Sequence, residues 1–409
     1  MSGIIKDQKG TVLMFAALTM PLLLGAAGLA VDTVQWTLWK RQLQRQADSA
    51  AMAGAFARTQ VSNVQSTATA DIARNMTVPF SAPPVIENAP TRGSYAGNAR
   101  AVRVVLQTQQ SLPFSSIFLK APPVIVAVAT AAAVSQGNYC MIALETNAVA
   151  AITMQGNATV NMGCGMASNS KGSNAVEAGG SSVITATPVS AVGGLQASSN
   201  YASPTTLLPY SAPQDDPFAH VPVPAVSGCG GNVNVGPNST RTLNPGCFSG
   251  MDLKGTVTLN PGIYYIDGGS LDFGSQAVVT GDNVTFVLTS SNAATNPSLI
   301  GALNINGGAT VNLTASTSGP FAGILFYQDP RATNTKSNIV NGNSTSKYQG
   351  AIYMPRQTVQ FNGTAGMNTE CIQIVARRIV FSGNSTIANQ CPSGSGAQSF
   401  VGTRVRLVG

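Results

Sequence analysis

The residues best able to do chemistry in this 409-residue chain are its few carboxylates and its single histidine. Hydrolases and lyases on β-helical folds use pairs of carboxylates that lie within several ångströms of each other on one face. Several acidic residues here precede a turn residue, as in Asp267-Gly268 and Asp282-Asn283, so turn formation explains them better than catalysis. The acidic candidates of the C-terminal half are Asp252, Asp267, Asp272, Asp282, Asp329 and Glu370.

Two further groups in a Pro-rich stretch could act as acids or bases. The only adjacent acidic pair is Asp215-Asp216, in a stretch where Asp is a common turn residue. His220 stands between Pro217 and Pro222, and no GxSxG signature of a serine nucleophile lies near it. No P-loop and no dinucleotide-binding motif in a βαβ context occurs either. We therefore predict no enzyme activity, no catalytic residue, and no cofactor or metal site.

Six cysteines could form disulfides or bind a metal. No CxxC occurs, and a single His argues against a structural zinc site. An even number of cysteines in an exported, charge-poor chain predicts disulfides made in an oxidising compartment; buried free thiols in a cytosolic protein are the alternative. Spacings of 24, 18 and 20 residues suggest three local pairs, although six cysteines permit about 15 connectivities. The residues are Cys140, Cys164, Cys229, Cys247, Cys371 and Cys391.

The composition argues against a salt-bridged cytosolic protein. Charged residues make up 9% of the chain, against about 25% in ordinary soluble domains. The net charge of +7 is concentrated in residues 1–120, which hold 11 Lys and Arg and 5 Asp and Glu. No dense basic cluster with interleaved aromatic residues occurs, so nucleic acid is excluded as a partner. The pair Arg377-Arg378 is expected to be solvated.

An apolar run near the N-terminus has the length of a membrane span. No residue from Gly10 to Val31 is charged, and the 21 residues from Thr11 as a helix span about 31 Å, the thickness of a bilayer's hydrocarbon core. Both tryptophans follow the run, where an interfacial aromatic belt would lie. The predicted anchor residues are Thr11, Phe15, Pro21, Leu24, Val31, Trp36 and Trp39.

A cleaved signal peptide is the alternative interpretation of this run. Lys6 and Lys9 would form its basic region and Gly28-Leu29-Ala30 its cleavage site. The run is long for a signal peptide, and helix-compatible sequence follows it without a turn, so we predict a retained single-pass anchor. The flanking Lys and Arg residues, two before the span and three after it, mildly oppose an exported C-terminal part. Export is inferred instead from the cysteines and the downstream composition.

The segment after the span predicts a small α+β unit. A continuous helix is expected from Asp32 to Arg74, with alanines at 47, 50, 51, 53, 55 and 57. This small-residue face could pack on a partner or on the strands of its own domain. Strands are predicted at Ala99–Thr108 and Val124–Ala133, with a short amphipathic piece at Ser111–Lys120 between them.

The remainder of the chain is predicted to be mainly β. Short Val- and Ile-rich strands alternate with Gly, Asn and Ser, and the phrases GNATVN (156–161), GGATVN (307–312) and GNSTIAN (383–389) nearly repeat. This pattern favours a parallel β-helix, in which each coil buries its inward residues by stacking on its neighbours; a β-sandwich or jelly roll is the alternative. The expected fold class is α+β, with a transmembrane long helix, a small α+β unit and a mainly β body. The expected domains are 1–34 (cytoplasmic N-terminus and span), 35–135 (helix and strands), 136–200 (first β portion), 201–227 (Pro-rich linker) and 228–409 (β-helix-like domain).

Residues 8–55 resemble the N-terminal module of the TadE/TadG-like group of Flp (tight adherence, Tad) pilus-assembly proteins. The hallmarks are Lys9-Gly10, Phe15-Ala16 followed by Pro21-Leu22-Leu23, the Gly-x-Ala-Val-Asp run ending at Asp32, and the Ala-rich stretch 43–55. The cysteine-bearing residues 139–170 resemble the extracytoplasmic part of TadG-like members.

This resemblance implies a structural component of the pilus assembly and secretion machine. It implies a pilin-like helix that anchors the chain in the bacterial inner membrane, and a body in the periplasm or at the cell surface. The implied partners are other pilus-assembly proteins, with contact to the outer membrane or surface also open. Phe15 stands where processed pilins carry Glu, which argues against cleavage by a prepilin peptidase. The alternative function is an exported β-helix protein that binds or degrades polysaccharide, as an adhesin or a glycan-active enzyme.

Overall fold

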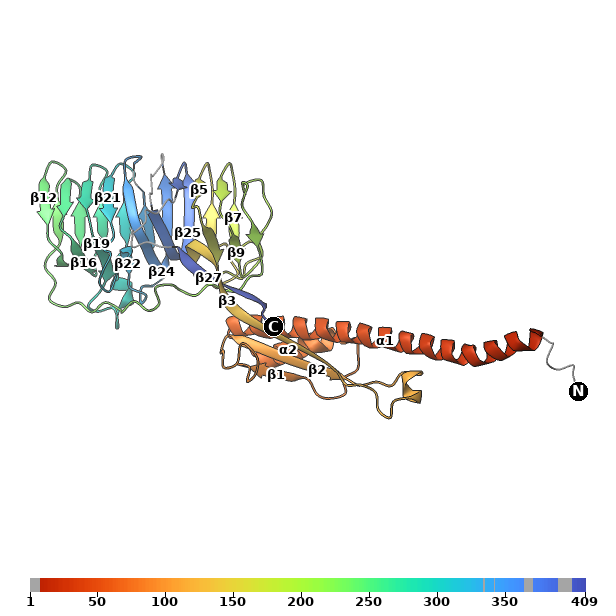
Figure 1. The fold of residues 1–409 in the computed structure, drawn as a ribbon. Helices are drawn as coiled ribbons and strands as arrows, with labels where there is room; N and C mark the ends of the chain where they lie inside the picture. The colour runs from red at the N-terminus through yellow and green to blue at the C-terminus, as the bar shows by residue number, and fades with distance from the viewer. Residues whose placement is uncertain (1–7, 334, 342, 364–370, 389–398) are drawn as a thin grey trace, which may run out of the picture. The chain divides into compact units, whose positions relative to one another are not determined.

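The computed structural model describes residues 8–333, 335–341, 343–363, 371–388 and 399–409. The chain forms two compact units, each described here by itself (Figure 1). Unit 1 comprises the chain up to Val134 together with Arg404–Gly409, and unit 2 is Ser135–Thr403. The chain passes between them in two strands, β3 (Ile125–Ala143) and β27 (Phe400–Leu407).

In its described residues, unit 1 contains two α-helices, three antiparallel strands and the C-terminal part of β27. Helix α1 (Gln8–Thr59) is one helix that runs through Pro21, and α2 (Val64–Arg74) follows it. Strands β1 (Val85–Asn88), β2 (Ala101–Thr108) and β3 pair in antiparallel order, and a 3₁₀ turn, η1 (Ser115–Ile117), lies between β2 and β3. The burial of β2 alternates along its length, so one face of the sheet forms the core with the helices.

The predicted continuous helix from Asp32 to Arg74 is wrong, because residues 60–63 interrupt it. Val61 has a φ of 53°, in the left-handed region that a β-branched residue rarely adopts. The Asn63 side chain accepts a hydrogen bond from the Ser66 N–H at 2.9 Å and begins α2 as its N-cap. The chain reverses there, and α2 buries a stripe of residues spaced four apart: Val64, Ala68 and Ile72.

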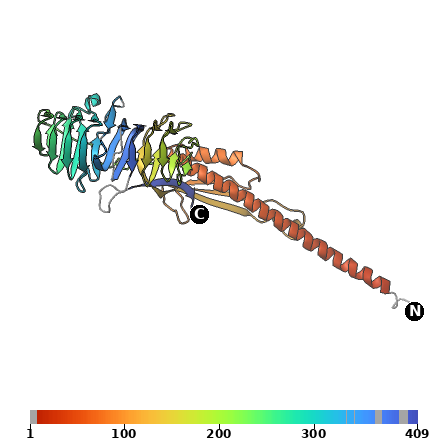
Figure 2. The same ribbon diagram turned by 90° about the horizontal axis from the view of Figure 1, so that it is seen from above.

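Unit 2 is a mainly β body, in which short strands lie side by side in a row (Figure 2). Most of these strands pair in parallel with the strand three places further along the chain. The first series is β11 (Val233–Val235), β14 (Met251–Leu253), β17 (Leu271–Phe273), β20 (Leu303–Ile305) and β23 (Ser337–Val340). The second is β12 (Thr240–Leu243), β15 (Thr256–Leu259), β18 (Val278–Gly281) and β21 (Thr310–Thr314). The third is β13 (Gly246–Phe248), β16 (Gly262–Asp267), β19 (Val284–Thr289) and β22 (Ile324–Gln328).

Two long strands connect these series to the strands of residues 139–208. The strands β24 (Lys347–Gly363) and β25 (Cys371–Gly383) pair with each other, and β25 pairs in parallel with β3 and β4. The earlier strands are β4 (Ile152–Met154), β5 (Thr159–Asn161), β6 (Gly165–Ser168), β7 (Val176–Ala178), β8 (Val183–Thr185), β9 (Val189–Ala191) and β10 (Leu207–Leu208). The remaining elements are β26 (Thr386–Ala388), which pairs with β5, and the 3₁₀ turn η2 (Pro297–Leu299).

The chain therefore enters the stack of strands in its middle. One line of paired strands runs β13, β16, β19, β22, β24, β25, β3, β6, β9 and β10. Along this line the strands of residues 246–383 come first and those of residues 125–208 follow, so the order in space is a circular permutation of the order in the sequence. The predicted separate domains 136–200 and 228–409 are thus one unit, and residues 404–409 belong to unit 1.

The predicted linker 201–227 is also part of this unit. Leu207 and Leu208 add a last strand to the stack, and residues 209–228, which we call the strap, lead back to the other end. Nine strand spacings of about 4.8 Å separate β10 from β13, or about 43 Å. Twenty extended residues reach about 66 Å, so the strap is long enough to return along one face.

The interior of unit 2 is a ladder of apolar side chains. Tyr264, Phe286 and Phe326 occupy one register position in successive strands, with ring centroids 5.4 and 5.7 Å apart. Phe361 and Phe381 form a similar stacked pair at 5.0 Å. All five rings are fully buried. Each coil thus completes its hydrophobic burial only against the next one.

The strap covers an outward face that is also apolar. Tyr327 on β22, Tyr353 on β24 and Val375 on β25 are register partners on the outward face of these strands, and all three are buried. Phe218 of the strap packs edge-on against Tyr353 at 5.3 Å. Val221 of the strap belongs to the same cluster. Because both faces of these strands are covered, their sequences are continuous apolar runs such as VTFVLT and ILFYQ, without alternation.

The hydrogen bond from Tyr353 to the strap gives a stability test. The Tyr353 hydroxyl donates to Asp216 Oδ2 at 2.8 Å, whereas the buried hydroxyl of Tyr327 has no partner among the described residues. We expect Tyr353→Phe to lower the free energy of unfolding by about 1–2 kcal/mol. Tyr327→Phe, the matched control, should leave stability unchanged or slightly raised. Urea unfolding of both variants checks this, and equal losses would contradict it.

Candidate functional site

The N-terminal half of α1 exposes a continuous apolar surface. Among the described residues, α1 is the one helix long and apolar enough to cross a membrane, and almost none of that stretch is buried. A folded soluble protein rarely exposes so much contiguous apolar surface. Figure 1 shows this half of the helix extending away from the rest of unit 1. Its exposed large side chains are Leu13, Met14, Phe15, Leu18, Met20, Leu22, Leu23, Leu24, Leu29 and Val31.

The predicted anchor residues lie along this surface. Phe15, Leu24 and Val31 are each more than 60% exposed, and Pro21 is exposed as well. Trp36 and Trp39 are half-buried, one to two turns beyond the apolar run. The side chain of Thr11 lies outside the described residues. All of these residues lie on one uninterrupted helix. Its apolar run is long enough to cross a bilayer, and the two tryptophans follow the run at the position expected for an aromatic belt.

The C-terminal half of α1 is used inside unit 1. Ala47, Ala50, Ala51 and Ala55 are fully buried, and Gly54 lies so close to β2 that an added Cβ would be 2.9 Å from Val102 Cγ1. The Gln44 amide donates to the Val128 carbonyl of β3 at 2.8 Å. Of the two predictions for the small-residue face, packing on its own domain is therefore correct for these alanines. A partner would have to bind elsewhere.

A family match coincides with this helix. Residues 10–59 match the family model "Putative Flp pilus-assembly TadE/G-like". The segment is TadE/G-like. The match confirms the resemblance seen in residues 8–55 and ends where α1 ends, at Thr59. No curated protein and no solved structure matches the chain.

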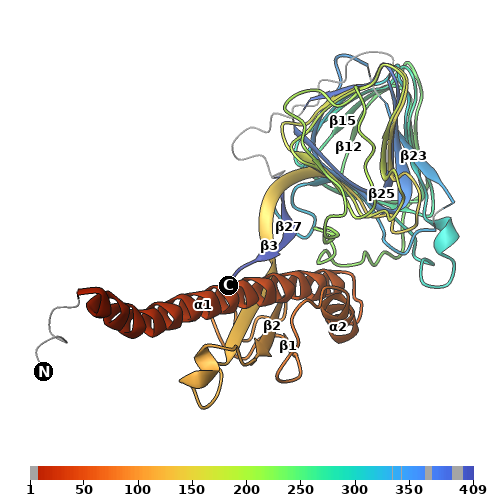
Figure 3. The same ribbon diagram turned by 90° about the vertical axis from the view of Figure 1, so that its right-hand side faces the viewer.

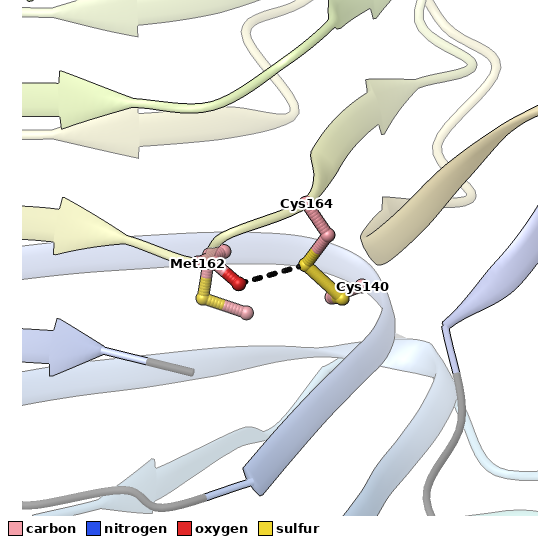
Figure 4. Close-up of a disulfide and its surroundings, with 3 residues drawn as sticks. All are labelled: Cys140, Met162 and Cys164. Carbon is pink, nitrogen blue, oxygen red and sulfur yellow. Dashed lines mark hydrogen bonds between the residues drawn. A yellow bond between two sulfur atoms is a disulfide. The ribbon is translucent and has the colours of Figure 1, made fainter. Parts of the chain in front are cut away.

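The TadE/G-like helix is followed by a β body that carries disulfides. Cys140 and Cys164 are joined, as are Cys229 and Cys247, which are the first two pairs that the spacing suggests. The first disulfide links β3 to the beginning of β6, two strands that pair with each other (Figure 4). Cys371 is disulfide-bonded as well, and Cys391 lies outside the described residues. A bridge closing about 20 residues contributes around 3 kcal/mol in the chain-entropy model.

The acidic residues considered for catalysis are engaged in turns and strand contacts. Asp267 accepts a hydrogen bond from the Ser291 N–H at 2.7 Å, and Asp282 accepts one from the Thr314 hydroxyl at 3.0 Å. Asp329 is fully buried and forms an ion pair with Arg331 at 2.6 Å. Glu370 lies outside the described residues. Within the described ranges no group of three or more His, Cys, Asp or Glu could hold a metal ion.

Asp216 and His220 of the strap differ in their surroundings. Asp216 accepts hydrogen bonds from the Phe218 N–H at 2.9 Å and from Tyr353. Burial raises the pKa of Asp216, although these hydrogen bonds and the nearby His220 act in the opposite direction. His220 itself is exposed. The carboxylate is thus used to fasten the strap to the stack.

Asp252 and Asp272 are acidic residues that lie opposite each other on paired strands. They are register partners on β14 and β17, with Asn234 and Asn304 on the strands beyond. A shallow cavity of about 390 Å³ lies beside them. Asp252 forms an ion pair with Lys254 at 2.7 Å. Burial raises the pKa of Asp272, with Asp252 adding to the rise and Asn304 and Lys254 opposing it. Asp252 is paired with Lys254, and Asp272 is hydrogen-bonded to Asn304. The two carboxylates therefore belong to a row of polar side chains on the outward face of successive strands.

An ion-pair cluster that the sequence did not predict lies where β25 pairs with β3 and β4, which we call the joint of the stack. Glu145 is buried and lies 2.9 Å from both Arg377 Nη2 and Arg378 Nε. Burial disfavours its ionisation, but the Asn147 N–H and the two guanidinium groups outweigh that, so its pKa lies below its ordinary value. The expectation of a solvated Arg377-Arg378 pair is wrong. Nothing local could have revealed Glu145, because it lies 232 residues away from Arg377.

The raised pKa of Asp272 has a consequence for stability against pH. The folded protein holds this proton to a higher pH than the unfolded chain does, so the contribution of Asp272 to stability falls as pH rises above about 4. We expect Asp272→Asn to raise the melting temperature at neutral pH. The gain should vanish below about pH 3, where Asp272 is protonated in both states. Thermal unfolding from pH 3 to 7 measures it, and a gain independent of pH would contradict the assignment.

Proposed function

We propose that the protein is a single-pass, membrane-anchored structural component of a Flp/Tad-type pilus assembly machine, with its β body in the periplasm. The observation that carries the proposal is the coincidence of two features on α1. The TadE/G-like match spans residues 10–59, and the N-terminal half of that stretch presents an exposed apolar surface of membrane-spanning length. A structural role, rather than an enzymatic one, accords with what this family implies.

Contacts at the end of the apolar run support a retained anchor over a cleaved signal peptide. The proposed cleavage site at 28–30 lies in the middle of α1. Gly28 lies against the Phe114 ring, and the Asp32 carboxylate accepts a hydrogen bond from the Ser115 N–H at 2.5 Å. Cleavage there would remove Gly28, against which Phe114 packs, and would place the new N-terminus next to Asp32. These contacts support the proposal that the helix is part of the mature protein.

For the body we propose a parallel β-helix, a rigid rod suited to a mechanical or scaffolding role. The repeat of three parallel series and the interior ladder of rings support this architecture. Its disulfides join neighbouring coils, and stable disulfides form in oxidising compartments such as the periplasm. The partners are the inner membrane and other pilus-assembly proteins. Because the buried alanines of α1 face their own domain, surfaces other than this stripe make those contacts.

Charges placed in the span test the anchor and the function together. Leu18 and Leu22 are 69% and 74% exposed, so substitution does not disturb a core. We expect Leu18→Arg with Leu22→Arg to disfavour insertion by about 2.5–3.5 kcal/mol for each charge. The variant should leave the carbonate-washed membrane fraction and fail to restore Flp filaments in a strain that lacks the protein.

The matched control carries Val34→Arg and Leu38→Arg, on exposed positions of the same helix beyond the apolar run. It should remain in the membrane fraction and restore filaments, because an interfacial Arg reaches the head groups. Filaments restored by both double variants would overturn the anchoring role. If the native protein stays in the membrane fraction but a strain that lacks it still makes normal Flp filaments, the pilus role alone is overturned.

Thiol labelling tests the orientation. A membrane-impermeant maleimide should label a Met76→Cys variant in intact spheroplasts, because Met76 is 58% exposed in unit 1. A Ser2→Cys variant, placed before the span, should be labelled only after lysis. The native protein should show no reactive thiol before reduction. The reverse labelling pattern, or six accessible thiols in the native chain, would contradict a periplasmic body.

A further inference from the structure

The loop between β2 and β3, residues 109–124, exposes a compact apolar surface. Ile117 is 73% exposed, Phe118 66%, Leu119 45% and Phe114 40%. The nearest charged residues on either side are Arg103 and Lys120. Four large apolar side chains within six positions are unusual on the surface of a soluble domain and indicate that another medium covers them.

This loop is docked on α1 at the end of the apolar run. The Phe114 ring lies over Gly28, where an added Cβ would be only 2.1 Å from Phe114 Cδ1, so the close approach requires glycine. One helical turn further on, the buried carboxylate of Asp32 accepts the hydrogen bond from the Ser115 N–H. The loop and the last turn of the predicted span are therefore held at the same level of the helix.

The backbone N–H groups of residues 115–119, at the apolar tip of the loop, are paired within the protein. Besides the Ser115 N–H, which Asp32 accepts, the Ser116 N–H donates to the Leu112 carbonyl at 3.0 Å. The N–H groups of residues 117, 118 and 119 donate to the carbonyls of Phe114 or Ser115 at 2.8 to 3.2 Å. Hydrocarbon offers no hydrogen-bond partners, so a segment can enter it only when its backbone groups are paired internally. The N–H groups of residues 115–119 meet that condition, and the apolar side chains beside them are exposed.

We propose that the 109–124 loop is a second membrane contact, inserted into the bilayer leaflet beside the outer end of the α1 span. The occupant of the surface is lipid, because the loop is continuous with the apolar surface of the span through Gly28. The half-buried tryptophans, Trp36 and Trp39, lie further along α1, at the level of an aromatic belt. Figure 3 shows the loop extending beyond the ends of β2 and β3 toward the N-terminal end of α1. The proposal rests on the membrane anchoring proposed above.

Lipid quenching of tryptophan fluorescence tests the insertion. The full chain, with Trp36→Phe and Trp39→Phe to remove its two tryptophans, is placed in phosphatidylcholine vesicles. Three single probes are compared: Phe118→Trp in the loop, Leu18→Trp in the span and Met76→Trp as the control. Met76 is exposed like Phe118. Its neighbour Thr77 accepts a hydrogen bond from Gln46, which is about 21 Å beyond Asp32 along the helix.

The probes should report three different depths. The Phe118→Trp probe should emit at shorter wavelength than the control and lose most of its emission to lipid brominated near the carbonyl end of the acyl chains. The Leu18→Trp probe should be quenched most by lipid brominated at mid-chain, and the Met76→Trp probe by neither. A water-like, unquenched Phe118→Trp probe beside a quenched Leu18→Trp probe would overturn the loop insertion and leave the anchor standing.

Two other outcomes are equally decisive. A blue-shifted Phe118→Trp probe that bromolipid does not quench would show that protein covers the loop, which also overturns the proposal. An unquenched Leu18→Trp probe would mean that the anchor proposal itself is wrong. As a second measurement, Gly28→Ala should increase amide hydrogen exchange of residues 115–119 and reduce quenching of the loop probe. The control Gly25→Ala, where an added Cβ has no neighbour within 4 Å, should change neither.

Discussion

The parallel pairing of β25 with β3 and β4 is the contact on which unit 2 depends. It joins two stretches of chain that are about 230 residues apart, Ile374 opposite Met141 and Ile379 opposite Ile152. Without it, each half of the stack would end in an open row of unpaired N–H and C=O groups. The Glu145 ion pairs with Arg377 and Arg378 lie at this joint. One hydrogen-bonded seam thus converts two short stacks into a single continuous one.

The strap follows from this arrangement. A chain that starts in the middle of a stack and winds to one end must return to the other end before it can fill the remaining half. The return path lies on the third series of strands, whose outward side chains are apolar and buried. Proline-rich extended backbone suits such a path because it does not compete for the edges of the sheet. Asp216 and Phe218 then attach the strap through Tyr353.

Local sequence patterns predicted many of the helices and strands of this protein, but not which distant strands pair with each other. The apolar run and the TadE/TadG-like hallmarks predicted α1, and strand phrases such as Thr256–Leu259 fall on strands of the structure. The near-repeats also indicate which segments lie side by side. In the structure, the 159–161 stretch of GNATVN pairs with residues 386–388 of GNSTIAN. Matching repeats mark equivalent positions in successive coils, so this pair could have predicted the joint between the two β portions.

Other features had no local signal. The break after α1 depends on one N-cap, Asn63, in a sequence whose helix propensity is otherwise uninterrupted. The partner of the Arg377-Arg378 pair is set by the joint of the stack. The alanine face of α1 fitted a partner and its own domain equally well, and only the fold of unit 1 decides between them. For the candidate site, the sequence predicted the span but not the loop that docks on it.

Helix α1 has an exposed part and a buried part, and its composition changes between them. Up to Val31 the helix carries large apolar side chains that are exposed, and from Ala47 onward it carries small ones that are buried against α2 and β2. Large side chains maximise contact with lipid, whereas alanines let the helix approach the sheet closely. Asp32 and Gly28 lie at the junction, and both are used to hold the 109–124 loop. A charged residue buried at the end of a span is costly unless it is hydrogen-bonded. The loop supplies that hydrogen bond to Asp32. In the proposed arrangement it also places its own apolar side chains where the span would leave the bilayer, so one contact would serve both the carboxylate and the apolar surface.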